Sequence, residues 1–214
     1  MRKLKKPAGK SYCLKTKKSK MAELKVLIEG YAKEGEDYES ASSTTVLIKD
    51  GKLNIIVDPG MNRKFLMNAL KKENLMPKDI DYVILSHYHL DHSLLTGIFE
   101  NAKIIYANDI YSFEGKISER GKIFSNNIEI IKTPGHNSDC RTILVKTEKG
   151  VIAICEDVFW WRDNEKQKID EKSLINHEDP YATDKEKLKA SRKKLLEVAD
   201  YIIPGHGKMF KVNK

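Results

Sequence analysis

The sequence predicts an α/β protein built as an αββα sandwich, in which two mixed β-sheets lie face to face with helices outside. In both halves of the chain, runs of β-branched and apolar residues are followed by helical spacing. No solenoid-type repeat appears, and no apolar run approaches the roughly 20 residues that a membrane span needs. At 214 residues with 40% hydrophobic content, the chain is long enough for one full core.

The first half of the chain contains most of the predicted strands. The residues Asp50 and Gly51 between two β-branched runs are typical of a hairpin turn. A polar stretch at residues 29–43 is predicted to be a long loop, and such loops are often functional. Helical spacing covers residues 62–74, and a shorter apolar segment at 93–99 predicts a second helix. Strands are predicted at residues 24–28, 44–49, 53–57, 82–85 and 103–106.

The second half repeats the pattern of strands that end in turns rich in Gly, Pro and His. Residues 182–199 form the clearest helical pattern, with leucines on one side and lysines elsewhere. A turn at residues 133–136 presents one histidine, and a turn at 204–207 presents another. Strands are predicted at residues 127–132, 142–146, 151–155 and 201–203.

Three imidazoles and a carboxylate lie within six residues directly after the predicted strand at 82–85. They are His87, His89, Asp91 and His92. Period-two alternation would place His87 and His89 on the same side, and a turn after them can bring Asp91 and His92 to the same point. Because imidazole nitrogens and carboxylate oxygens suit zinc, iron or manganese, this segment predicts a metal site.

Five of the six histidines stand at strand ends, and two of the five lie far from this segment. His136 and His206 follow later strands, and Asp157 stands at another strand end. Together with the first four residues they give seven candidate ligands from four separate segments. One four-coordinate ion does not need seven ligands, so we expect a centre for two ions that share one carboxylate.

On these motifs the sequence resembles the metallo-β-lactamase fold superfamily over about residues 24–210. The likeness rests on the His-x-His-x-Asp-His segment, the Pro-Gly-His turn, the later aspartate and the final Gly-His-Gly. It implies that one metal is bound by His87, His89 and His136, and the other by Asp91, His92 and His206. It also implies that Asp157 bridges both ions and that Asp58 supports the site from behind.

The resemblance implies a metal-dependent hydrolase with two divalent ions, for which we expect zinc, with iron or manganese as alternatives. A hydroxide that bridges two ions would be the nucleophile, and Asp91 would move a proton by analogy with the family. The expected substrate is a small ester, thioester or lactone. No Ser or Cys nucleophile is then required.

Other functions remain open at this point. The same superfamily contains nucleases, so a metal-dependent phosphodiesterase or ribonuclease is one alternative. A single iron held by the His and Asp residues, as in the family's persulfide dioxygenases, is another. A metal-stabilised binding module without catalysis is the weakest, because binding alone does not require a second metal.

The net charge of +8 comes from the start of the chain. Nine of the 39 basic residues and none of the 31 acidic residues lie at positions 1–20, which leaves 30 basic and 31 acidic residues elsewhere. We expect residues 1–20 to be a disordered tail, followed by one domain at 21–214. The tail either contacts nucleic acid weakly or is a dispensable extension or mis-assigned start before Met21, and the second interpretation is favoured. Three widely spaced cysteines and the lack of an apolar leader favour a cytoplasmic location with reduced thiols.

Several residues near the candidate ligands have two interpretations. Trp160 and Trp161 follow Asp157 closely and either wall a substrate cleft or pack in the core. Tyr88 is expected to point away from the metal into the sheet, and His177 is expected in a solvated loop. Cys140 and Cys155 are expected to be unreactive thiols, the second of them buried in a strand.

Overall fold

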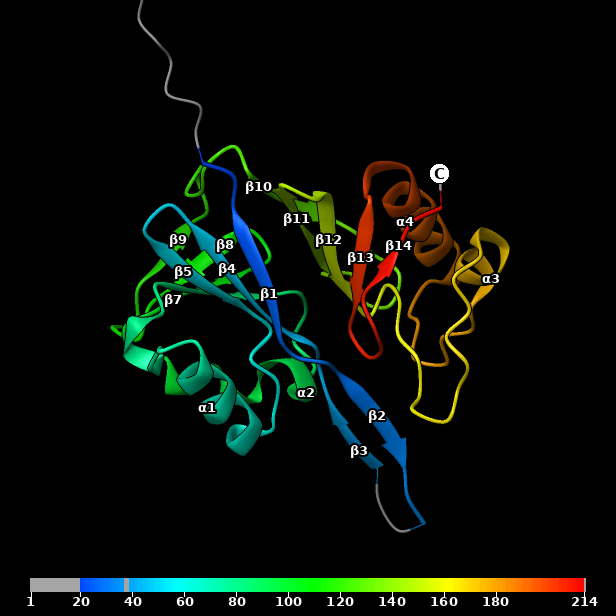
Figure 1. Cartoon of the computed structure of the whole chain (residues 1–214), viewed down its shortest axis with the longest axis horizontal. Coiled ribbons are helices and arrows are strands. Elements are labelled where there is room, and N and C mark those ends of the chain that lie inside the picture. The colour runs from blue at the N-terminus through cyan, green and yellow to red at the C-terminus, as the bar shows by residue number, and fades with distance from the viewer. Residues whose placement is uncertain (1–19, 37–38, 214) are drawn as a thin grey trace, which may run out of the picture.

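The computed structural model describes residues 20–36 and 39–213 (Figure 1). The predicted basic tail therefore lies outside the described residues except for Lys20, whose amine pairs with Glu23 at 2.7 Å. Within the described ranges, the strands form one sheet of seven strands, one of five and one of two. The described helices include none that is long and apolar enough to cross a bilayer.

The first sheet has seven strands in the spatial order β1-β4-β5-β6-β7-β8-β9. Its central strands β5, β6 and β7 run parallel and the outer pairs are antiparallel, so the sheet is mixed. Its strands are β1 (Glu23–Ile28), β4 (Thr45–Asp50), β5 (Leu53–Val57), β6 (Tyr82–Leu85), β7 (Lys103–Tyr106), β8 (Asp109–Tyr111) and β9 (Ile117–Glu119).

The second sheet has five strands in the spatial order β10-β11-β12-β13-β14. Strands β12 and β13 are parallel and the other pairs are antiparallel, so this sheet is also mixed. Its strands are β10 (Ile128–Lys132), β11 (Arg141–Thr147), β12 (Gly150–Glu156), β13 (Tyr201–Pro204) and β14 (Phe210–Lys211). In each sheet, parallel neighbours end at the same edge, which is where the candidate ligands follow.

Helices cover the outer face of each sheet. Figure 1 shows α1 and α2 beside the first sheet and α3 and α4 beside the second. Asn62 caps α1 by accepting from Phe65 N, and Asp184 caps α4 by accepting from Lys187 N. The helical segments are α1 (Arg63–Lys72), η1 (Pro77–Asp79), α2 (Leu90–Ser93), η2 (Leu94–Ile98), α3 (Glu171–Asn176) and α4 (Lys185–Val198).

Alternation along the strands produces three apolar layers. On β4, Val46 and Ile48 face the space between the two sheets, where they join Ile143 and Ile154 of the second sheet. Leu47 points to the other face and packs in the layer beneath α1. A third layer lies between the second sheet and helices α3 and α4. This order of layers confirms the predicted αββα sandwich.

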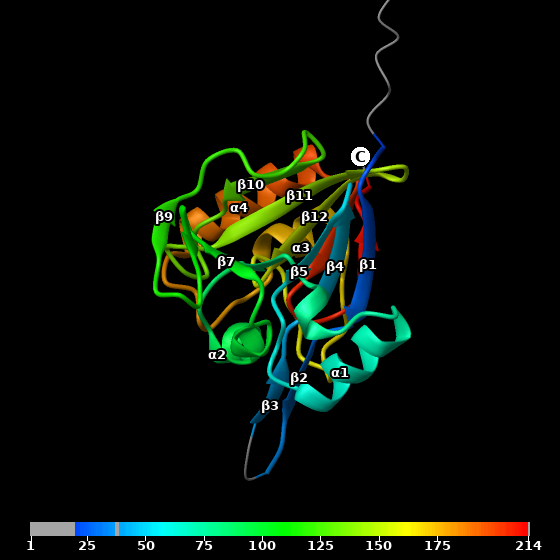
Figure 2. The ribbon, with the colours of Figure 1, turned by 90° about the vertical axis from the view of Figure 1, so that its left-hand side faces the viewer.

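The predicted loop at 29–43 is wrong, because the segment forms a hairpin of β2 (Tyr31–Glu34) and β3 (Glu39–Ser42). The hairpin projects beyond both sheets (Figure 2). Its strands contain Ala, Ser, Lys and Glu, which have low strand propensity, so composition gave no signal. Ala32 N donates to Asp163 Oδ1 and Ala32 O accepts from Asp163 N, so tertiary contacts hold the hairpin.

Five further elements were not predicted, and each is short; one of them is the three-residue 3₁₀ helix η1. Strands β8, β9 and β14 have two or three residues, and helix α3 has six. Periodicity needs a longer window to be visible, so such elements are defined by the partners that they pair with. The predicted helices at 62–74 and 182–199 are confirmed with shorter bounds, because the capping residues Asn62 and Asp184 set their starts.

Candidate metal centre

The candidate ligands meet where strands of both sheets end. The first sheet contributes His87 and His89 from the turn after β6, and Asp91 and His92 from the short helix α2. Main-chain bonds fix this turn, since Ser86 O accepts from Arg141 N at 2.9 Å and His92 O accepts from Gly60 N at 3.0 Å. The second sheet contributes the residues that follow β10, β12 and β13, namely His136, Asp157 and His206.

One set of candidate ligands consists of His87, His89, His136 and Asp157. One donor atom from each lies within 4.8 Å of the donor atoms of the others. His89 Nδ1 and His136 Nε2 are 3.2 Å apart. The set is therefore compact enough for a single ion with three nitrogen donors and one oxygen donor.

A second set consists of Asp91, His92 and His206, whose donor atoms also lie within 4.8 Å of one another. Asp91 Oδ2 is 3.2 Å from His206 Nε2 and 3.5 Å from His92 Nε2. His206 Nδ1 is 2.9 Å from Tyr31 O and donates to it in the tautomer that leaves Nε2 free. That bond orients His206 toward the centre.

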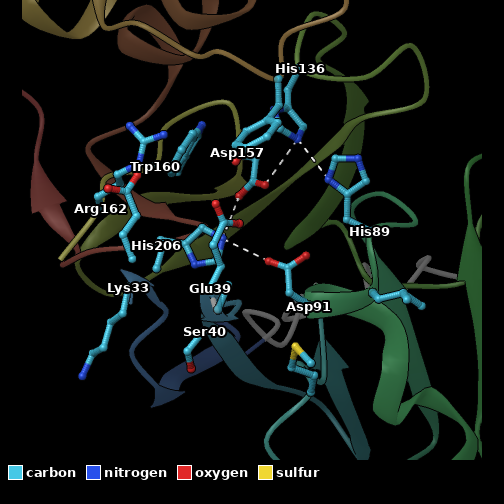
Figure 3. A pocket seen from close by; sticks show the side chains of 16 residues that line it. Lys33, Glu39, Ser40, His89, Asp91, His136, Asp157, Trp160, Arg162 and His206 are labelled. Carbon is cyan, nitrogen blue, oxygen red and sulfur yellow. Dashed lines mark hydrogen bonds and ion pairs between the residues drawn. The ribbon is translucent and has the colours of Figure 1, made fainter. Parts of the chain in front are cut away.

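Asp157 lies between the two sets (Figure 3). Its Oδ2 is 3.5 Å from His87 Nε2, 3.4 Å from His136 Nε2 and 3.3 Å from His92 Nε2. Its Oδ1 is 3.7 Å from His206 Nε2. One carboxylate thus faces imidazoles of both sets, which is the geometry that a residue shared by two ions requires.

The local backbone explains how Asp157 reaches this position. The pairing of β12 with β13 shifts register between Ile154 and Glu156, and Glu156 has a positive φ of 45°. Gly205 lies against the aspartate, because a Cβ at Gly205 would stand 1.9 Å from Asp157 Oδ1. Residue 205 must therefore be glycine for Asp157 to keep this orientation.

Unpaired buried atoms test whether these residues fit a metal. His87 Nε2, His92 Nε2 and Asp157 Oδ1 are buried and have no hydrogen-bond partner among the residues that the structure describes. Unpaired buried polar atoms are costly and uncommon in native proteins. Since all three atoms point into the same centre and are typical metal donors, the residues fit divalent ions.

The electrostatics of the centre are strongly coupled. Burial and the neighbouring His92 charge lower the pKa of His87 to about 4. Burial also opposes the charged form of His92, but Asp157 and Asp58 outweigh it and raise the His92 pKa well above its ordinary value. Burial opposes the charged form of Asp157 as well, yet His92 and His206 hold its pKa well below the usual range. A positive charge is therefore strongly favoured beside Asp157.

Asp58 lies behind the centre and is fully buried. Its Oδ2 accepts a bond of 2.7 Å from His92 Nδ1, and its Oδ1 accepts one of 2.8 Å from Ser86 N. Ser86 Oγ donates to Asp58 and lies 3.0 Å from His87 Nδ1. Although Asp58 lies within ligand distance of His87 and His92, its oxygens are already used, so it supports two imidazoles.

Two buried carboxylates at the centre were not predicted from the sequence. Asp179 Oδ2 is 2.8 Å from His136 Nδ1. Glu156 is buried, and its pKa is raised well above the ordinary value by burial and by the Asp58 charge. Asp179 stands in a polar loop without any motif, so no sequence signal points to it. Glu156 adjoins Asp157, but its buried position depends on the kink after β12.

A cleft of about 460 Å³ opens over the centre. The β2–β3 hairpin forms one wall, and Trp160 and Arg162 lie on another (Figure 3). Tyr181, which packs against Trp160, also lines the cleft. Arg162 Nε pairs with Glu34 at 2.6 Å, and the guanidinium stacks over the Trp160 ring at 5.5 Å. Trp160 thus walls the cleft, whereas Trp161 packs in the core with α3 and α4.

Two predictions about nearby side chains are wrong, whereas the predicted places of the two thiols, Cys140 in a loop and Cys155 buried in a strand, are confirmed. Tyr88 is 57% exposed and does not point into the sheet, because the strand has already ended at Leu85. His177 is half-buried, and its Nε2 donates to Trp160 O at 2.7 Å. Cys140 and Cys155 are free and buried; burial raises the pKa of Cys140 to about 12 and that of Cys155 well above the ordinary value. Cys13 lies outside the described residues.

The chain is similar in sequence to known proteins. The family model of the metallo-beta-lactamase superfamily matches residues 40–107. Metallo-beta-lactamase domain-containing protein 1 of Xenopus laevis is 31% identical over 200 residues, which cover 88% of this chain and 81% of the frog protein. The mouse protein of the same name is 29% identical over 180 residues, and the match covers 79% of this chain and 65% of the mouse protein.

Solved structures share the fold. A Thermotoga maritima protein of metallo-beta-lactamase type aligns with a TM-score of 0.67 at 20% identity, over 89% of this chain and 99% of that chain. A dizinc quorum-quenching lactonase aligns with a TM-score of 0.58 at 18% identity, over 79% of this chain and 73% of that chain. With the frog relative, the family model and this fold in agreement, the chain belongs to the metallo-beta-lactamase superfamily and is a metal-dependent hydrolase of that family.

Proposed function

We propose that this protein hydrolyses a small ester, thioester or lactone at a centre of two divalent ions. The observation that carries the proposal is the place of Asp157, whose carboxylate faces His87, His92, His136 and His206 at 3.3 to 3.7 Å. A carboxylate that faces the imidazoles of both ligand sets is better placed to bind two ions than to bind one.

The two sets of side chains would hold one ion each and share Asp157. His87, His89 and His136 offer three nitrogens for the first ion, whereas Asp91, His92 and His206 offer one oxygen and two nitrogens for the second. We propose that the ions are zinc. Because this set of donors contains no thiolate, it also suits iron or manganese. Such ions, when bound, supply water activation at neutral pH and polarise the oxygen of the scissile bond.

Asp91 is the residue best placed to hold or move a proton. Its side chain is 22% exposed, against 6% for Asp157, so it is the more accessible carboxylate of the centre. Burial opposes its charged form, but His206 and His92 lower its pKa below the ordinary value, so it is present as a carboxylate near neutral pH. It lies at the floor of the cleft, where a substrate enters.

The cleft supports a small organic substrate. Its volume of about 460 Å³ is in the range of small-molecule sites. Trp160 and Tyr181, with ring centroids 5.8 Å apart, offer an aromatic wall, and Ala32 and Ala41 leave room opposite. The dizinc lactonase that shares the fold makes a lactone a reasonable first substrate to test.

The alternative functions receive less support from the site. A ribonuclease would be expected to present a basic rim, but the cleft residues Lys33 and Arg162 are accompanied by Glu34 and Glu39. A single-iron dioxygenase would use only one of the two sets. The single-iron alternative does not account for the shared position of Asp157, whereas a two-metal phosphodiesterase would use that position as well.

The proposal is tested with the purified protein, reconstituted with two equivalents of zinc and assayed against a panel of lactones, thioesters and carboxylic esters. Hydrolysis of at least one class is expected, and it should disappear with His206→Ala. Glu148→Ala, an exposed residue in the turn before β12, is the matched control and should retain the activity. If the zinc-loaded protein hydrolyses none of the panel but cleaves RNA or a phosphodiester, the proposed substrate class is wrong.

A further inference from the structure

We propose that Asp179 is a positioning residue that fixes the His136 imidazole for metal binding and ties it to the aromatic wall of the cleft. The inference rests on the proposed metal centre and adds a role for a residue that does not belong to either ligand set. It concerns the segment between α3 and α4, which connects the second helical layer to the site.

Both oxygens of the Asp179 carboxylate are used. Oδ2 is 2.8 Å from His136 Nδ1, and Oδ1 accepts a bond of 3.0 Å from Tyr181 N. The residue is only 3% exposed, so these bonds are shielded from water. A buried carboxylate bonded in this way holds both partners firmly.

The bond to Asp179 determines the tautomer of His136. A carboxylate is an acceptor, so Nδ1 must carry the hydrogen, and Nε2 then presents its lone pair when the ring is neutral. His136 Nε2 is the atom that faces Asp157 at 3.4 Å and His89 Nδ1 at 3.2 Å. A carboxylate behind an imidazole ligand fixes the orientation of the ring and increases its basicity.

Other bonds attach the turn that contains His136 to this segment and to helix α4, but they reach only the backbone of the turn. Thr183 N donates to His136 O at 3.1 Å, and Asp184 N donates to Gly135 O at 2.9 Å. Ser191 Oγ of helix α4 donates to Pro134 O at 2.7 Å. These bonds place the turn, whereas the Asp179 carboxylate orients the imidazole itself.

The hydrogen bond that Asp179 Oδ1 accepts from Tyr181 N connects Asp179 with a residue of the substrate cleft. Tyr181 lines the cleft and packs its ring against Trp160, with centroids 5.8 Å apart. Arg192, which is buried beneath this segment, donates to His177 O and to Val158 O; burial lowers the pKa of Arg192 to about 10, and the Asp179 charge opposes this shift. One carboxylate therefore connects a metal ligand with the backbone of a wall residue.

Asparagine cannot replace Asp179 fully, which gives a sharp test. His136 Nδ1–H and Tyr181 N–H both donate, and an amide offers one oxygen and one NH₂ group. In Asp179→Asn, one donor must face the NH₂ group and lose its bond. Asp179→Glu keeps two acceptor oxygens on a longer side chain, and exposed Glu178→Gln is the control for charge in the same loop.

The experiment measures metal retention first, without substrate. Each variant is loaded with zinc and equilibrated with a competing chelator, and its metal content is then determined. Asp179→Asn is expected to bind the first ion about 10- to 100-fold more weakly than the parent. Glu178→Gln should match the parent, and Asp179→Glu should recover part of the loss.

Two further readouts separate positioning from a general loss of structure. The absorption bands of the cobalt-substituted protein report the coordination of the ion and should change in Asp179→Asn, while the thermal midpoint of the cobalt-free protein should fall only by the few degrees that one lost buried hydrogen bond costs. The KM for a hydrolysed substrate should rise as well, because Tyr181 loses its support. If Asp179→Asn does not fold, the absorption spectrum of the cobalt-substituted Asp179→Glu variant provides the test instead.

If both Asp179 variants retain metal and give spectra like those of the parent, the proposed role of Asp179 is wrong, but the proposed metal centre is not affected. A parent protein that binds no divalent metal would overturn the proposed metal centre, and with it this role. The two failures are therefore distinguishable by the behaviour of the parent.

Discussion

Two buried aspartates support imidazoles from opposite sides of the centre. Asp58, at the end of a strand of the first sheet, accepts a hydrogen bond of 2.7 Å from His92 Nδ1. Asp179, in the loop before α4, accepts one of 2.8 Å from His136 Nδ1. Both supported imidazoles present Nε2 to Asp157 Oδ2, at 3.3 and 3.4 Å. The arrangement is nearly symmetric, although the two supports come from unrelated parts of the fold.

The two supports differ in what else they hold. Asp58 stands at the end of β5 and also accepts from Ser86 N and Ser86 Oγ, so it joins two neighbouring parallel strands. The carboxylate of Asp179 accepts in addition only from Tyr181 N among the described residues. We therefore expect loss of Asp58 to affect folding and metal binding together, and loss of Asp179 to affect mainly metal binding and the cleft.

The largest effect is expected at Asp157, on which both supported imidazoles converge. Asp157→Ala removes the one carboxylate that faces both sets, so hydrolysis should fall by more than about 10³-fold and metal content should drop to one ion or fewer. The kcat/KM and the metal content of the variant check this. Retention of two ions with ordinary activity would show that Asp157 is not shared.

The next largest effect is expected from Asp58→Ala. The variant removes the buried carboxylate to which His92 Nδ1, Ser86 N and Ser86 Oγ donate, so the free energy of unfolding should fall by about 3–5 kcal/mol. Urea denaturation of the metal-free protein measures this. Asp81→Ala is the control, because the side chain of exposed Asp81 accepts one bond of 2.8 Å from Asn54 N, and its loss should cost about 1 kcal/mol. Equal losses in the two variants would contradict the supporting role of Asp58.

Metal binding is expected to release protons. The charges of Asp157, Asp58 and Asp179 act against burial, raising the pKa of His92 well above and that of His136 above its ordinary value, so both rings hold a proton more strongly than a free imidazole does. An ion requires the neutral ring, so affinity should rise with pH by about tenfold per unit for each proton displaced. Calorimetry in buffers of different ionisation enthalpy counts the protons, and a count of zero at pH 7 would contradict the expectation.

The smallest effect is expected in the cleft wall. Trp160→Leu keeps an apolar side chain but removes the indole that packs against Tyr181, so KM should rise by about tenfold with metal content unchanged. Phe113→Ala, an exposed aromatic residue in the β8–β9 loop, should leave KM unaltered. A lower metal content in Trp160→Leu would instead assign Trp160 to the support of His206, whose ring lies 6.1 Å away.

The comparison of Asp58 with Asp179 also shows what the sequence can and cannot predict. Asp58 follows a β-branched run directly, so its place at a strand end is visible, and the histidines at 87, 89, 92, 136 and 206 are visible for the same reason. Asp179 lies in a polar loop where nothing distinguishes it from Glu178. Its role depends on how α4 packs, and packing is not encoded by any local pattern.

The same limit applies to the fold. The sandwich and the strands of its core were predicted because alternating apolar residues define the buried faces of β4, β5 and β12. The β2–β3 hairpin was not predicted, because its strands are held by Asp163 and by pairing with each other rather than by apolar burial. This hairpin forms part of the cleft, so the substrate-facing wall was the least predictable region.

The central claim is that two ions share Asp157, and the metal content of the protein tests it most directly. Elemental analysis of the protein purified without added metal, and again after zinc loading and removal of free ions, should approach two equivalents per chain. The same measurement on Asp157→Ala should give one or fewer. A parent protein that saturates at a single ion, with Asp157→Ala binding that ion equally well, would contradict the account.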